Sequence, residues 1–176
     1  MDSNMTGKDR NPSGLLIEYL SIIPKGKALD IACGEGRNSI YLARHGFEVE
    51  AIDISEAAIN RSREAAGDLR INFIAADLEG FKIPADTCDL IINFNYLQRS
   101  LVPAIKNGLK RGGYLIFETY TLEQKELGHP KNPEFLLGTN ELLRLFSDLH
   151  IIYYREGVVE EAERKKAVAS LVGRKV

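Results

Sequence analysis

The segment from Lys27 to Ala43, K-A-L-D-I-A-C-G-E-G-R-N-S-I-Y-L-A, constrains the fold more than any other part of this chain. It combines a short apolar strand, a turn that contains Gly34 and Gly36, and the start of a helix. A strand that enters a helix through a glycine turn brings bare backbone and helix N–H groups to the carboxyl edge of a parallel sheet. The segment therefore predicts an α/β protein that holds a ligand at that edge.

A second predicted strand, Glu48 to Asp53, ends in an acid 17 residues after Gly36. This is close to the spacing of about 20 residues at which a carboxylate binds the hydroxyls of a ribose. A dinucleotide site would need a third glycine where this chain has Ser39. Asp30, just before the turn, would repel a phosphate and attract an ammonium group. Together these residues favour a positively charged adenosine ligand without phosphate, and S-adenosylmethionine has that chemistry.

The run L-D-I-A-C-G-E-G resembles motif I of the class I S-adenosylmethionine-dependent methyltransferases, with Ala32 where that family often has its first glycine. The resemblance implies an α/β, Rossmann-like fold with a seven-stranded, mainly parallel sheet, an antiparallel last strand and helices on both faces. It also implies S-adenosyl-L-methionine as the cofactor and S-adenosyl-L-homocysteine as the product.

The resemblance also assigns the cofactor contacts, since acids follow three successive predicted strands. Asp30 would contact the methionine ammonium, Asp53 the ribose hydroxyls and Asp77 the adenine amino group. Each acid could instead cap a turn or a helix. The full set of expected cofactor residues is Asp30, Ala32, Gly34, Gly36, Asn38, Asp53, Ile54, Asp77, Leu78 and Asn93.

The remaining pattern alternates helices and strands, which predicts a mainly parallel sheet in one domain over residues 13–176, preceded by a mobile tail over 1–12. The expected strands include Arg70 to Ala75, Cys88 to Phe94, Tyr114 to Thr119, His150 to Glu156 and Lys166 to Gly173. The expected helices are Leu15 to Ile23, Arg37 to His45, one capped by Ser55 that runs to Ala66, Gln98 to Leu109, and one capped by Thr139 that runs to Ser147. Turns are expected at Arg111-Gly112-Gly113, in the loop Gly128 to Gly138 and over the charged stretch Glu160 to Lys165.

The acceptor side of the site carries fewer signals. Asn93-Phe94-Asn95-Tyr96 keeps the first and last residues of the Asn-Pro-Pro-Tyr pattern but lacks both prolines, which argues against an exocyclic amine as acceptor. The candidate catalytic residues are His129, Glu118 and Tyr96, with His129 in a loop long enough to act as a lid. A solvated loop histidine and simple aromatic packing are the alternatives. Arg99 could attract an anionic acceptor or lie on the surface at a helix start.

The segment G-R-N-S-I-Y-L-A at Gly36 to Ala43 resembles the tellurite-resistance protein B type of methyltransferase. That resemblance implies methyl transfer to a small molecule, with a thiol or a chalcogen compound as the acceptor. Two alternatives stay open: a non-catalytic S-adenosylmethionine-binding regulatory protein, and a methyltransferase that acts on a macromolecule.

The composition limits partners and location. The formal net charge is −2 and no block of basic residues is present. We therefore do not expect a nucleic acid as a partner. No apolar run reaches the ~18–20 residues of a membrane span. Cys33 and Cys88 lie in apolar strand-like settings, and the three histidines have no ligand spacing. We therefore expect a cytoplasmic monomer or homodimer without a metal, a disulfide or a membrane partner.

Overall fold

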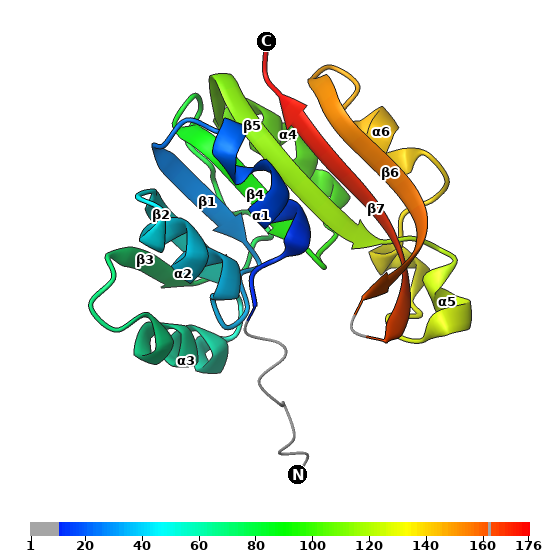
Figure 1. The fold of residues 1–176 in the computed structure, drawn as a ribbon, viewed down its shortest axis with the longest axis horizontal. Helices are drawn as coiled ribbons and strands as arrows, with labels where there is room; N and C mark the ends of the chain where they lie inside the picture. Colours follow the sequence, from blue (N-terminus) through cyan, green and yellow to red (C-terminus); the bar gives the residue numbers. More distant parts are fainter. Residues whose placement is uncertain (1–10, 162) are drawn as a thin grey trace.

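A computed structural model describes residues 11–161 and 163–176, so most of the predicted tail at 1–12 lies outside the described residues. Its centre is a seven-stranded sheet in the order β3-β2-β1-β4-β5-β7-β6 (Figure 1). The strands are β1 Lys27–Ile31, β2 Glu48–Asp53, β3 Ile71–Ala75, β4 Cys88–Phe94, β5 Leu109–Tyr120, β6 His150–Glu161 and β7 Arg164–Arg174. The pairs among β1 to β5 are parallel, and β7 runs antiparallel to both of its neighbours. The predicted fold class is confirmed.

Helices cover both faces of the sheet (Figure 1). The helices are α1 Gly14–Tyr19, α2 Arg37–Arg44, α3 Glu56–Ala66, α4 Val102–Gly108, α5 Gln124–Leu127 and α6 Glu141–Leu145, with 3₁₀ turns η2 Leu20–Ile22, η3 Arg99–Leu101 and η4 Pro133–Phe135. Side chains from α1, α2 and α3 share one buried cluster, and side chains from η3, α4 and α6 share another. We call these two sides of the sheet the α2 face and the α4 face. No helix in the described part of the chain has the length and apolar character needed to cross a bilayer.

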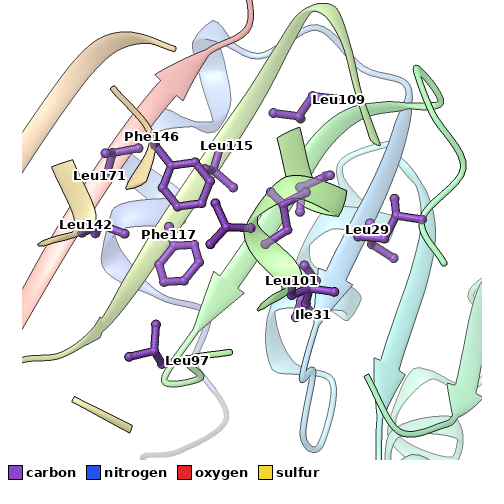
Figure 2. Close-up of a cluster of buried hydrophobic side chains, with 14 of the residues drawn as sticks. Leu29, Ile31, Leu97, Leu101, Leu109, Leu115, Phe117, Leu142, Phe146 and Leu171 are labelled. Carbon is purple, nitrogen blue, oxygen red and sulfur yellow. The ribbon is translucent and has the colours of Figure 1, made fainter. Parts of the chain in front are cut away.

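The central strand β4 is apolar on both sides because helices cover both of its faces. Leu90 and Ile92 belong to the α2-face cluster, whereas Ile91 belongs to the α4-face cluster. Figure 2 shows the α4-face core, where Phe117 of β5 lies against Phe146, with ring centroids 5.5 Å apart. This alternation of side chains lets one strand serve two cores.

Several predicted boundaries are confirmed. The ranges of β2 and β4 are those expected, and the hydroxyl of Ser55 accepts a hydrogen bond from the N–H of Ala58 at 3.2 Å, which caps α3. The first helix is shorter than predicted: the α-helix ends at Tyr19, and one 3₁₀ turn follows it. Pro24 favours an extended conformation at Ile23, so the helical segment ends at Ile22.

The predicted turn at Arg111-Gly112-Gly113 is wrong, since these residues lie inside β5. The register between β4 and β5 shifts between Cys88 and Leu90, and Gly112 takes a left-handed φ of +83° at this irregularity. A β-carbon at Gly113 would lie 2.9 Å from the Cys88 carbonyl oxygen. The glycines therefore let the strand bend and pair closely rather than end. The helix expected to reach Leu109 ends at Gly108 and begins with a 3₁₀ turn.

The C-terminal elements also differ from the prediction. Asn140 rather than Thr139 precedes α6, with a left-handed φ of +56°, and α6 ends at Leu145. The loop after β5 contains α5, which no sequence pattern indicated. The charged residues expected to connect the last strands continue both strands as a long hairpin, which turns at Glu163 with a φ of +64°. Cross-strand pairing of Glu160 with Lys165 supports this extension because the charges are opposite.

Candidate active site

The turn after β1 is built from left-handed residues. Ala32, Gly34 and Gly36 have φ values of +54°, +55° and +76°. A β-carbon on Gly36 would lie 3.1 Å from Phe73 and Ser62, so glycine is needed there for packing. A β-carbon on Gly34 would meet nothing within 4 Å, so this backbone borders open space. The turn therefore presents exposed backbone at the carboxyl edge of the sheet, as a nucleoside ligand requires.

Asp53, at the end of β2, lies beside this turn. Its Oδ2 accepts a hydrogen bond from the N–H of Gly34 at 2.8 Å, and its Oδ1 accepts one from the N–H of Ser55 at 2.9 Å. The carboxylate thus fixes both the glycine turn and the start of α3. Each oxygen keeps a second lone pair, so the same carboxylate can also accept hydrogen bonds from a diol.

Asp30 is buried on the α2 face, with 2% of its surface exposed. Its Oδ2 accepts a hydrogen bond from the hydroxyl of Ser39 at 2.6 Å. Burial raises the pKa of Asp30 to about 7, although Ser39 and the positive charge of Arg37 oppose that rise. A cationic ligand group would add a further charge that favours the ionised form.

The third acid, Asp77, is exposed after β3, and its Oδ1 accepts a hydrogen bond from the N–H of Glu79 at 2.9 Å. Leu78 is buried beside it. Ile54, directly after Asp53, is 70% exposed. An apolar side chain so exposed next to a polar edge offers a surface on which a flat ring can pack.

The two asparagines of the predicted set use their side chains within the protein. The Oδ1 of buried Asn38 accepts a hydrogen bond from the N–H of Ser13 at 2.8 Å. The amide of Asn93, at the end of β4, donates to the carbonyl of Tyr96 at 2.7 Å. Each of these side-chain amides thus has one of its two polar atoms engaged within the protein.

The three candidate catalytic residues occupy different places. The hydroxyl of Tyr96 donates to Gln98 at 2.6 Å, and its pKa is raised by burial and by the nearby charges of Asp77 and Asp53. His129 is exposed in the loop after α5, where its backbone carbonyl accepts a hydrogen bond from Gln124 at 3.0 Å. The charges of Asp53 and Asp77 thus act on Tyr96, whereas His129 belongs to a surface loop.

Glu118, on β5, lies in a polar cluster with the last hairpin. Its Oε2 accepts a hydrogen bond from the hydroxyl of Ser170 at 2.7 Å, and its Oε1 lies 3.3 Å from the Nζ of Lys166. The same Nζ lies 2.5 Å from a carboxylate oxygen of Glu161. Glu118 is thus a partly buried acid with two protein donors, Ser170 and Lys166.

Arg99 does not fit the suggested role in attracting an anion. Its Nε and Nη2 pair with the carboxylate of Glu141, at 2.5 and 3.0 Å. Nη1 donates to the carbonyl of Glu134 and Nη2 to that of Leu136, at 2.8 and 2.9 Å. The guanidinium instead ties η3 to η4 and to the start of α6.

Within residues 11–161 and 163–176, no three His, Cys, Asp or Glu side chains gather in a way that could hold a metal ion. Cys33 and Cys88 are both buried and free.

Comparison with known proteins agrees with this geometry. Residues 28–113 match a family model described as a methyltransferase domain. The chain is 29% identical over 157 residues to TehB of Haemophilus influenzae, described as a probable S-adenosyl-L-methionine-dependent methyltransferase, and the match covers 84% of this chain and 54% of that protein. The crystal structure of TehB from the same species matches with a TM-score of 0.81 at 25% identity, covering 93% of this chain and 62% of TehB. These matches support a class I S-adenosylmethionine-dependent methyltransferase of the TehB type.

A second relative of this methyltransferase is a ubiquinone biosynthesis O-methyltransferase of Coxiella burnetii, 36% identical over 117 residues. That match covers 62% of this chain and 50% of the relative. The chain thus spans about half the length of the curated relatives it matches. S-adenosylmethionine is the cofactor of the family, so the predicted cofactor is confirmed.

Sequence reasoning did not find Lys166 and Ser170, the partners of Glu118. They lie 48 and 52 residues further along the chain than Glu118. Only the antiparallel register, which pairs Glu118 with Ser170, brings them together. Nothing in the sequence around this lysine and this serine indicates that they contact Glu118.

We expect Asp30→Asn to stabilise the cofactor-free methyltransferase at pH 8. The folded-state pKa of about 7 lies above the ordinary value of 3.8, so the contribution of this group to stability is full below pH 4 and is lost as the pH rises to about 7. The asparagine should raise the free energy of unfolding at pH 8 by about 1–2 kcal/mol and have little effect at pH 4. Urea unfolding at both pH values measures this, and a less stable variant at pH 8 would contradict it.

Proposed function

We propose that this methyltransferase transfers a methyl group from S-adenosylmethionine to a small-molecule acceptor, with thiols and chalcogen compounds as the first candidates. The observation that carries the proposal is the glycine turn clamped by Asp53, with open space beside Gly34. Such a turn leaves backbone and carboxylate free to face a nucleoside.

The residues present fit the cofactor in charge and in shape. Asp53 would accept hydrogen bonds from the ribose diol, and exposed Ile54 would pack against the adenine. Asp77 would accept from the adenine amino group, with Leu78 beside the ring. Asp30 would face the methionine ammonium, directly or through water. The backbones of Ala32, Gly34, Gly36, Asn38 and Asn93 would complete the binding site.

When bound, the cofactor would supply a methyl group that its sulfonium activates. A lone pair of the acceptor would form the new bond to the methyl carbon, and the electron pair of the broken sulfur–methyl bond would stay on the sulfur of S-adenosylhomocysteine. The proton of the acceptor would pass to the solvent or to a base. The protein's part is to align the acceptor and to exclude water. Tyr96, which follows β4 and whose pKa the charges of Asp77 and Asp53 raise, is the candidate to line the reaction centre. Glu118 is the candidate to bind the acceptor, and His129 would have to move inward with its loop to serve as a base.

Sheet register supports a place for the acceptor near Glu118. Ile31, Asn93 and Phe117 lie in one row across β1, β4 and β5, and Glu118 is one residue beyond that row. Neighbouring strands are about 4.8 Å apart, so Glu118 stands about 10 Å from the glycine turn. Asp30 and Glu118 lie on the same face, because Ala28 and Ile116, each two residues before one of them, belong to the α2-face core.

We further propose that residues 13–176 act as a single methyltransferase domain in the cytoplasm, as a monomer or homodimer. The buried free thiols of Cys33 and Cys88 support a reducing compartment.

The test of this function is S-adenosylhomocysteine formation with a panel of acceptors that begins with thiols, selenite and tellurite. Product that depends on enzyme and acceptor supports small-molecule transfer. Cofactor binding without product from any acceptor would instead support a regulatory binding protein. Product only with RNA or protein acceptors would support the macromolecular alternative.

A further inference from the structure

We propose that Ser62, a buried serine in the middle of α3, is a positioning residue for cofactor binding, because its hydroxyl holds the backbone of Gly34 in place. Ser62 is 0% exposed, so it lies behind the glycine turn and does not line the open space beside Gly34. The inference rests on the proposed cofactor site at this turn. It adds a residue that acts on the cofactor only through that backbone.

Both polar backbone atoms of Gly34 have partners within the protein. The N–H donates to Oδ2 of Asp53 at 2.8 Å, and the carbonyl oxygen accepts a hydrogen bond from the Ser62 hydroxyl at 3.0 Å. Gly34 has a φ of +55°, and a β-carbon there would meet nothing within 4 Å, so side-chain packing does not fix its conformation. The two hydrogen bonds therefore set the orientation of the peptide groups around this flexible residue.

Helix α3 is attached to the turn at a second point. Asp53, which accepts from Gly34, also accepts a hydrogen bond from the N–H of Ser55 at 2.9 Å, and Ser55 caps α3. Ser62 lies about two helical turns further along α3, so the carboxylate, the glycine turn and the helix form a closed ring of contacts. This ring keeps the carboxylate and the turn backbone in one relative position, which lowers the cost of binding a ligand that contacts both.

The surroundings of Ser62 suit a small residue with a hydroxyl group. A β-carbon on Gly36 would lie 3.1 Å from both Cβ and Oγ of Ser62, so the serine packs directly against the turn. The same hydroxyl lies 2.9 Å from the carbonyl oxygen of Ala58, four residues earlier, which is a common contact for a serine inside a helix. The helix carbonyl alone would satisfy this hydroxyl, so the fold of α3 does not depend on the contact with Gly34.

Other groups near the turn are poor substitutes for this hydroxyl. Among the described residues, the Sγ of Cys33 lies 3.7 Å from the Gly34 carbonyl oxygen, and a thiol is a weak donor. Helix α3 also contacts the turn through Arg61, whose Nε lies 2.7 Å from Oε1 of Glu35, but the two side chains are 56% and 49% exposed. Solvent and salt weaken such a pair. Without the hydroxyl, the Gly34 backbone can reorient, and cofactor binding has to order it.

Ser62→Ala should weaken binding of S-adenosylhomocysteine by about three- to tenfold, the range for one hydrogen bond between neutral groups. Alanine is smaller than serine and has a higher helix propensity, so the variant should fold. Calorimetric titration of the full chain measures the affinity. Hydrogen exchange of the backbone amides of residues 33–36 in the cofactor-free protein measures the order of the turn, and it should be faster in the variant.

Two control variants separate this role from the stability of α3 and from its general attachment to the turn. Ile59→Val removes a methylene group from the buried face of α3, and it should lower the urea midpoint while affinity and amide exchange at 33–36 stay at wild-type values. Arg61→Gln removes the exposed pair with Glu35, and it should change the affinity by less than about twofold.

A folded Ser62→Ala protein with wild-type affinity or unchanged amide exchange would overturn the inference. An equal loss of affinity in Ile59→Val or in Arg61→Gln would also overturn it. Failure of the proposed function would show separately, as absence of S-adenosylmethionine and S-adenosylhomocysteine binding by the unaltered chain.

Discussion

Asp53→Ala should weaken S-adenosylmethionine binding by about 10- to 150-fold, which corresponds to about 1.5–3 kcal/mol for hydrogen bonds to a charged group. Two effects add in this variant. The ribose would lose its carboxylate partner, and the N–H groups of Gly34 and Ser55 would lose the acceptor that now fixes the glycine turn and the start of α3. Calorimetric titration of the variant with S-adenosylhomocysteine measures the loss.

Asp77→Ala is the matched comparison, because Asp77 is exposed and accepts one local hydrogen bond from the N–H of Glu79. Its effect on affinity should be several-fold smaller than that of Asp53→Ala. Circular dichroism of both variants checks that the fold is kept. An Asp53→Ala protein that is folded and binds the cofactor with wild-type affinity would contradict the assignment of Asp53 to the ribose.

Phe117→Ala should lower the free energy of unfolding by about 3–5 kcal/mol, the usual range for removing a buried phenylalanine. Phe117 is 2% exposed and lies among Leu97, Leu142, Leu171 and Phe146 (Figure 2). Because these neighbours come from different elements, the cavity cannot close by the movement of one side chain. Urea unfolding followed by circular dichroism measures the change.

Phe135→Ala provides the control for Phe117→Ala, since Phe135 is 52% exposed on η4. It should change the free energy of unfolding by less than about 0.5 kcal/mol. Equal effects of the two substitutions would show that the α4-face core is not packed as described.

The parts of the fold that local chemistry controls could be predicted from the sequence. The left-handed turn at Gly34 and Gly36, the cap at Ser55 and the buried strand Cys88 to Phe94 each follow from residues within a few positions of one another. The candidate acids Asp30 and Asp53 follow from the same logic, because parallel strands end at one edge.

The parts that depend on distant partners could not be predicted. Gly112 and Gly113 have the composition of a turn, but the pairing of β5 with β4 and β7 keeps them inside a strand. Lys166 and Ser170 acquire meaning only when the hairpin register sets them against Glu118. The resemblance places Asn38 in the cofactor set, but the sequence does not indicate that its side chain accepts a hydrogen bond from the N–H of Ser13, 25 residues earlier.

The central claim is that the edge formed by Asp30, the glycine turn and Asp53 binds the cofactor of the methyltransferases. The most direct test is calorimetric titration of the purified chain with S-adenosylmethionine and S-adenosylhomocysteine, with NAD as a parallel control. We predict micromolar, one-to-one binding of the first two and none of NAD. Absence of binding for both cofactor forms, or binding of NAD alone, would contradict the account.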